Sequence, residues 1–222
     1  MKNLRIGLEY EFFVETLAGI VVAAREATYN TDGNPVVGEV RTSVCDNMVD
    51  AVFDLRKRIY LEEQALNKKG FRMANTHEIT VNDEFLRDCR RTGYDIKKME
   101  NLTELSIYPT GQLGKFLPRE VFKASLQVNM SSVRNIYYSE AEKIDVGSKS
   151  MYRAKSSHIV GSQAFDYITP IAIMDKTFKD DIEYADRVKG VYAIKDGIGG
   201  NRVEYRSLPN FINLDTLINI FK

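Results

Sequence analysis

The chain has 222 residues, 44% apolar and 28% charged, which is typical of one globular domain over residues 1–222. Its 31 basic and 31 acidic residues cancel, and this argues against nucleic acid or an anionic membrane as a partner. The sequence has no signal-peptide pattern, no apolar run of about 18 residues and only two cysteines. We therefore expect a cytoplasmic protein. The sequence does not indicate its oligomeric state.

The first third of the chain predicts short strands around one long helix. Apolar and β-branched runs predict strands over 5–14, 19–24 and 36–42, with a turn over 30–35. A roughly 3.6-residue period predicts a helix over 47–69, capped near Asp46 and ended by Gly70. The expected buried face of this helix is Val49, Val52, Phe53, Ile59 and Leu66.

The rest of the chain mixes strands, helices and polar stretches. We expect helices over 82–92, 164–174, 178–189 and 214–221, strands over 122–132 and 201–207, a surface excursion over 101–118 and a mobile loop over 139–161. Helices interrupt the strands without regular alternation. This order predicts an α+β fold, in which helices pack on one face of an antiparallel sheet and the other face is solvated or binds a ligand.

Polar residues recur two positions apart within the predicted strands. The pairs are Glu9 and Glu11, Glu39 and Arg41, Gln127 and Asn129, and Glu204 and Arg206. Because strand side chains alternate, both members of each pair share a face, while apolar neighbours such as Leu8 and Val128 face the helices. The pattern predicts one acidic, amide-rich face that contains arginine. The alternative is the solvated face that any antiparallel sheet exposes.

An acidic face of this kind has a specific chemistry. Clustered carboxylates repel one another unless cations lie among them. Oxygen ligands suit Mg²⁺ or Mn²⁺, and magnesium commonly binds together with phosphates. Arginine stabilises a phosphoryl group during its transfer. The residues alone thus indicate metal-dependent phosphoryl chemistry.

Four segments occur in the order of a known set of motifs. They are GLEYEFF at 7–13, TDGNPVVGEVRT at 31–42, SLQVNMS at 125–131 and VEYRSLPNF at 203–211. Together they resemble the motifs of ATP-dependent carboxylate–amine ligases of the glutamine synthetase/glutamate–cysteine ligase superfamily. The short chain is most similar to the compact phage-type amidoligases. The resemblance implies that the acidic, concave face of the sheet is the active site, with ATP and Mg²⁺ (or Mn²⁺) as cofactors.

The resemblance also implies a role for each matched residue. Arg206 would stabilise the transferring phosphate, with Glu204 as the second catalytic residue, and Asn129, Arg153 and Arg206 would contact the nucleotide. Gln127 departs from the family, which commonly has histidine there. Arg153 and Ser157 are alternatively ordinary loop residues. The implied metal ligands are Glu9, Glu11, Asp32, Glu39, Gln127 and Glu204.

The implied reaction forms an amide through an acyl phosphate, from a small-molecule or peptide carboxylate and an amine that the sequence does not identify. Two alternatives remain. One is a catalytically inactive family member that acts as a binding or assembly module, which Gln127 favours. The other is a phosphotransferase on the related fold that forms no amide.

Overall fold

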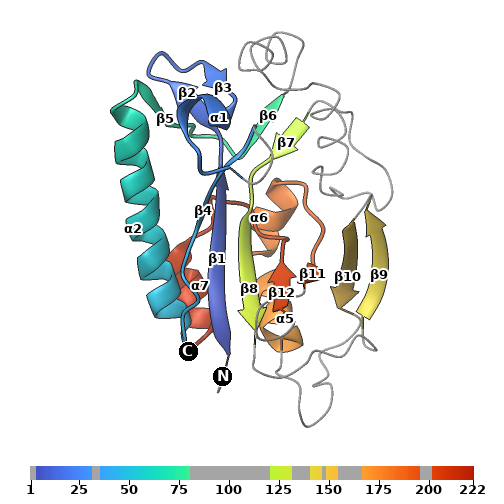
Figure 1. Cartoon of the computed structure of the whole chain (residues 1–222). Helices are drawn as coiled ribbons and strands as arrows, with labels where there is room; N and C mark the ends of the chain where they lie inside the picture. The colour runs from blue at the N-terminus through green and yellow to red at the C-terminus, as the bar shows by residue number, and fades with distance from the viewer. Residues whose placement is uncertain are drawn as a thin grey trace.

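The computed structural model describes residues 4–31, 36–80, 121–131, 141–146, 149–154, 167–195 and 202–222, and Figure 1 labels its elements. The chain is a mixed α and β protein built on antiparallel sheets, which confirms the predicted class. Its largest sheet has seven strands in the order β4-β1-β8-β12-β11-β10-β9. Their bounds are β4 Gly38–Arg41, β1 Arg5–Phe12, β8 Leu126–Ser131, β12 Arg202–Tyr205, β11 Val191–Lys195, β10 Lys149–Ala154 and β9 Ala141–Val146.

The remaining elements extend or cover this sheet. A three-stranded sheet has the order β3-β2-β5, and a two-stranded sheet pairs β6 with β7. Their bounds are β2 Val14–Thr16, β3 Val21–Val22, β5 Phe71–Met73, β6 Glu78–Thr80 and β7 Val121–Lys123. The helices are α1 Ala24–Ala27, α2 Met48–Asn67, α5 Ile168–Thr177, α6 Lys179–Tyr184 and α7 Leu214–Ile220. No helix in the described residues is long and apolar enough to cross a bilayer.

The long helix α2 begins and ends close to where the sequence predicts. Asn47, not Asp46, caps it, because the Asn47 side chain accepts a hydrogen bond from the backbone N–H of Asp50 at 2.9 Å. Gly70 follows the helix with φ of 84°, which suits glycine. The expected buried face was wrong in part, since Phe53 is 63% exposed and Val49 is exposed as well. The buried residues are Met48, Ala51, Val52, Leu55, Glu62 and Leu66.

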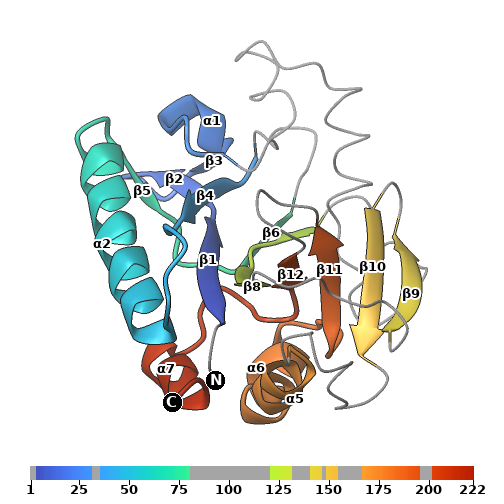
Figure 2. The same ribbon diagram turned by 60° about the horizontal axis from the view of Figure 1, so that its bottom comes forward.

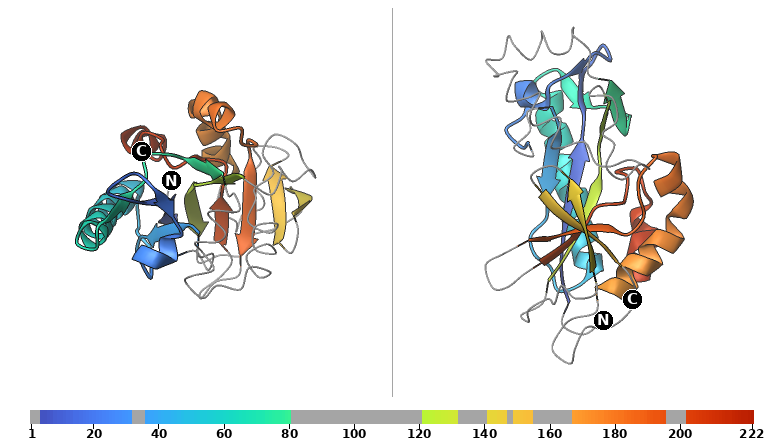
Figure 3. Two further views of the ribbon diagram at one scale, coloured as in Figure 1. Left: turned by 90° about the horizontal axis from the view of Figure 1, so that it is seen from above. Right: turned by 90° about the vertical axis from the view of Figure 1, so that its right-hand side faces the viewer.

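The hydrophobic core lies on one face of the seven-stranded sheet. Leu8 on β1 pairs with Val128 on β8, which pairs with Tyr205 on β12, and all three side chains are buried. Helices α5, α6 and α7 lie on one side of this sheet, and α2 runs beside β4 and β1 (Figures 2 and 3). The alternate residues of the same strands therefore point away from this core.

Two sequence predictions for the second half of the chain were wrong. Part of the segment expected to be a mobile loop forms the strands β9 and β10, which pair with each other at the edge of the sheet. Strand β11 falls just after the predicted helix over 178–189 and was missed. Strands β9 and β10 are polar and are specified by their pairing partners more than by their own sequence. Strand β11 is instead a short apolar run, VYAIK, which by itself does not distinguish a strand from a helix. The helix predicted over 82–92 lies outside the described residues.

Candidate functional site

The strand register brings most of the predicted site residues together. Glu9 lies opposite Arg41 on one side and Gln127 on the other, and Glu204 lies opposite Asn129. Directly paired residues of neighbouring strands project from the same face of a sheet. The face opposite the hydrophobic core thus carries Glu9, Glu11, Glu39, Gln127, Asn129 and Glu204, and the Arg206 position continues the alternation just beyond β12.

For three further predicted residues the structure does not describe the side chain. Asp32 and Ser157 lie outside the described residues. The backbone of Arg153 lies on β10 in register with Val191, and β11 separates β10 from β12. The nucleotide-binding role of Arg153 and the metal-binding role of Asp32 therefore stay predictions.

Glu11 is held by hydrogen-bond donors from the start of β8. Its Oε2 accepts from the backbone N–H of Ser125 at 2.8 Å and from the Ser125 hydroxyl at 2.5 Å. Its Oε1 accepts from Gln127 Nε2 at 2.8 Å. All three residues are buried, so these bonds replace the water that a carboxylate would otherwise need. Gln127 occupies the position where the resembled family has histidine, and here its amide donates to a neighbouring carboxylate.

Glu9 and Glu204 are connected through arginine and asparagine side chains. Arg206 Nη1 is 2.7 Å from Glu204 Oε1, and both side chains are almost completely buried. Arg202 Nη2 is 3.8 Å from Glu9 Oε1 and 3.7 Å from Glu204 Oε2, which places its charge between the two acids. Asn129 Nδ2 donates to Glu9 Oε1 at 3.1 Å. This part of the face is therefore a charge-balanced network and not a cluster of acids alone.

A similar balance occurs at the β4 edge of the sheet. Arg41 Nε pairs with Glu39 Oε1 and lies 3.8 Å from Glu9 Oε2. Glu39 is buried, whereas the Arg41 side chain is exposed. Arg41 can consequently move away from the acids without crossing the protein interior.

Arg187 is a buried cation that the sequence does not reveal. Its Nη1 donates to the carbonyl of Ala124 at 3.1 Å, and its Nη2 donates to the carbonyl of Arg206 at 3.2 Å. Burial lowers the pKa of Arg187 to about 10, and the nearby Glu11 carboxylate opposes this decrease. Because Ala124 precedes Ser125, Arg187 joins the segment that holds Glu11 to the segment that carries Arg206.

One buried oxygen on this face has no hydrogen-bond donor among the described residues. Asn129 is 7% exposed, and its Oδ1 accepts no hydrogen bond within the described part of the chain. In the same described ranges, no group of three or more His, Cys, Asp or Glu side chains is arranged to hold a metal ion. The oxygen donors of Glu9, Glu204 and Asn129 nevertheless match the ligand type that Mg²⁺ prefers.

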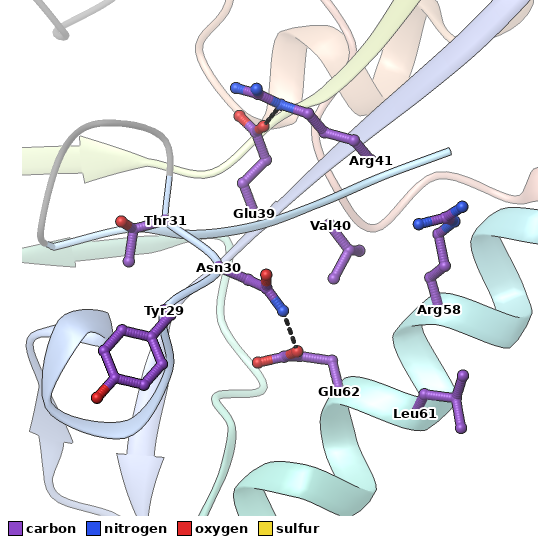
Figure 4. Close-up of a pocket in the computed structure, with 9 residues that line it drawn as sticks. All are labelled: Tyr29, Asn30, Thr31, Glu39, Val40, Arg41, Arg58, Leu61 and Glu62. Carbon is purple, nitrogen blue, oxygen red and sulfur yellow. Dashed lines mark hydrogen bonds and ion pairs between the residues drawn. The ribbon is translucent and has the colours of Figure 1, made fainter. Parts of the chain in front are cut away.

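A cavity of about 410 Å³ opens beside this face, at the outer edge of β4, where the backbone N–H of Glu39 donates to the carbonyl of Asn30 at 2.9 Å (Figure 4). Glu39 and Arg41 line it from one side of the β4 strand. Asn30, Val40 and Glu62 line it from the other side, where α2 lies. This volume falls within the range of about 300–1,000 Å³ that is usual for small-molecule sites.

Comparisons with models of protein families, with curated proteins and with solved structures find no match to this chain. The interpretation of the site therefore depends on its own geometry and on the motifs in the sequence. Two residues of the site, Ser125 and Arg202, were not predicted. Each lies two positions before a predicted polar pair, so the same alternation could have placed them on this face. Arg187 lies in a turn between α6 and β11, and no pattern in the sequence indicates it.

Proposed function

We propose that this protein is an ATP-dependent carboxylate–amine ligase. The observation that carries the proposal is the neighbouring position of Glu9, Asn129 and Glu204 on three adjacent strands, with the Arg206 guanidinium against Glu204. These residues belong to different sequence motifs among the four that resemble the ligase family. The order of those motifs along the chain does not by itself require the residues to be neighbours. A buried arginine beside carboxylate and amide oxygens suits the binding of a phosphate together with its counter-cation.

The proposed reaction has two steps. In the first, an oxygen of the substrate carboxylate attacks the γ-phosphorus of ATP, the bond to the β-phosphate oxygen breaks, and ADP leaves. In the second, the neutral amine attacks the acyl carbon, the bond to the phosphate oxygen breaks, and the amine loses a proton. The phosphate that leaves carries one oxygen from the substrate carboxylate.

The side chains contribute position and charge to this reaction. Arg206 is held in place by the Glu204 carboxylate on its side chain and by Arg187 on its carbonyl, so its guanidinium needs little reorganisation to stabilise the transferring phosphoryl group. Glu9, Glu204 and Asn129 would hold Mg²⁺, which supplies charge neutralisation for the phosphates. Arg202, which is only half-buried, would then give up its place between the two acids.

Isotope transfer tests the proposal directly. The protein is incubated with ATP, Mg²⁺ and a pool of carboxylates labelled with ¹⁸O, together with a pool of amines, and all products are analysed by mass spectrometry. We expect ADP, an amide and phosphate that contains one ¹⁸O atom, and we expect none of these from the Glu204→Gln variant. ADP with a phosphorylated product and no amide would indicate a phosphotransferase. No consumption of ATP with any pool would indicate an inactive binding module.

A further inference from the structure

The cavity at the edge of β4 contains a buried acid that the proposed chemistry does not use. Glu62 lies on α2, is 7% exposed and points into the cavity (Figure 4). Its Oε2 accepts a hydrogen bond from Asn30 Nδ2 at 2.5 Å. Glutamate is rarely buried unless it is paired with a cation, because the loss of hydration is costly.

No cation of the described residues compensates Glu62. Its one hydrogen bond there is to the neutral amide of Asn30, and it forms no ion pair in those parts of the chain. Arg58 is one helical turn away, but its Nε bonds to Asp54 at 3.0 Å and its Nη2 to Ser43 Oγ at 3.1 Å. Lys69 Nζ donates to the carbonyl of Ala27 at 2.6 Å. The cavity therefore offers a carboxylate to a positively charged ligand.

The same observations argue against a ligand with a carboxylate group. A zwitterion would need, at the other end of the cavity, a cation whose charge is not already balanced by a carboxylate. The arginines that line the cavity are Arg41 and Arg58, and they are already paired with Glu39 and with Asp54. The side chain of Val40 lies between the levels of Glu39 and Glu62, and Leu61 on α2 adds apolar surface beside Glu62, which suits a methylene chain (Figure 4).

The two ends of the cavity lie on opposite sides of β4. Glu62 lies on the side of α2, whereas Glu39 projects from the face that carries Glu9 (Figure 4). A short alkyl chain that passes the outer edge of β4 beside Val40, clear of the backbone hydrogen bond between Glu39 and Asn30, would thus place one end at Glu62 and the other at Glu39. An amine at Glu39 would be next to the proposed site of acyl transfer.

We propose that this cavity binds an aliphatic diamine, with one ammonium group on Glu62 and the second, reacting amine at Glu39. The identification of the diamine as the amine substrate rests on the proposed function. The cavity itself discriminates by charge: Glu62 favours a ligand with a second ammonium group over a monoamine of the same length or an amino acid.

Calorimetric titration without ATP tests the proposal. The ligands are 1,4-diaminobutane, 1-aminobutane and 4-aminobutanoate, and the proteins are the wild type, Glu62→Gln and Glu63→Gln. Glu63 is the matched control, because it is the next residue on α2 and its carboxylate binds the backbone N–H of Met73 instead of lining the cavity. We expect 1,4-diaminobutane to bind the wild type and Glu63→Gln equally, and Glu62→Gln about tenfold or more weakly, as for loss of one charged hydrogen bond.

Amide chemical shifts of the wild-type protein give a second measurement that does not depend on a variant. Addition of 1,4-diaminobutane should shift the signals of Asn30, Val40 and Leu61, which line the cavity. The proposal is wrong if these signals do not move, if Glu62→Gln binds the diamine as well as the wild type does, or if 4-aminobutanoate binds more tightly than 1,4-diaminobutane.

Amide formation with other amines but no diamine binding would refute this proposal alone. Diamine binding without any ATP-dependent amide would refute only the ligase.

Discussion

Replacing Arg206 by methionine should destabilise the protein strongly, because it removes the guanidinium that lies 2.7 Å from Glu204. Glu204 is 0% exposed, so water cannot replace the lost partner. Loss of one member of a buried ion pair typically costs about 3–5 kcal/mol. Arg202 stays 3.7 Å from the other oxygen of Glu204, and we therefore expect the lower end of this range, about 3 kcal/mol.

A double variant separates the charge from the packing. Arg206→Met combined with Glu204→Gln leaves neither charge buried, so its free energy of unfolding should return to within about 1 kcal/mol of the wild type. Urea denaturation of the wild type, both single variants and the double variant at one pH measures this coupling. A cost below about 0.5 kcal/mol for Arg206→Met would contradict the buried pair, since that value is typical of surface positions.

The same variants test the role of Arg206 in catalysis. Arg206→Met, assayed at a temperature at which it stays folded, should release phosphate from ATP more slowly by about 10²–10³, the usual effect of losing one donor to the transition state. Arg206→Lys should recover part of this rate, because lysine keeps the charge but lacks the planar fork. Turnover by folded Arg206→Met close to that of the wild type would exclude Arg206 as the residue that stabilises the phosphate.

Three further predictions concern the framework around the site. Arg187→Met leaves two carbonyl groups without their donor and should cost about 2–4 kcal/mol in urea denaturation, with partial recovery by lysine. Gly38→Ala should cost about 1–3 kcal/mol, because the added methyl group would overlap the buried Phe12 ring. Burial raises the pKa of Asp175, so its contribution to stability is present below the ordinary value of about 4 and is lost as pH rises through the raised native value. As pH rises above about 4, the urea midpoint of the wild type should therefore fall, and the urea midpoint of Asp175→Asn should fall less.

Each of these has a clear contrary result. An Arg187→Met variant as stable as the wild type would mean that other donors satisfy both carbonyls. An unchanged Gly38→Ala variant would contradict the pairing of Gly38 with Phe12. Parallel pH profiles for the wild type and Asp175→Asn would mean that Asp175 ionises normally in the folded protein.

The sequence predicts the central strands well because alternation is a local signal. Leu8, Tyr10 and Phe12 alternate with Glu9 and Glu11, and strand β1 lies where this pattern indicates. The phase of α2 was predicted less well, because helix periodicity tolerates a shift of one residue when apolar side chains are frequent. Phe53 was assigned to the buried face on that basis, and it is exposed while Leu55 is buried.

The candidate site shows the same limit. Alternation predicts which face each polar side chain occupies, and the structure brings these residues into adjacent register. Their ion pairs could not be predicted, since the contacts of Arg202 and Arg187 depend on which strands and turns become neighbours. The strand order β4-β1-β8-β12 joins segments from both ends of the chain, and no local pattern encodes that order.

This strand order also determines when the protein can fold. Glu11 and Gln127, which are hydrogen-bonded across β1 and β8, are 116 positions apart in the chain. Synthesis at roughly 5–20 residues per second separates the two strands by on the order of ten seconds. During that interval one edge of β1 lacks its partner strand, and pairing between segments so distant in sequence is typical of slow folding. We expect the nascent chain to depend on chaperones until β8 and β12 have left the ribosome.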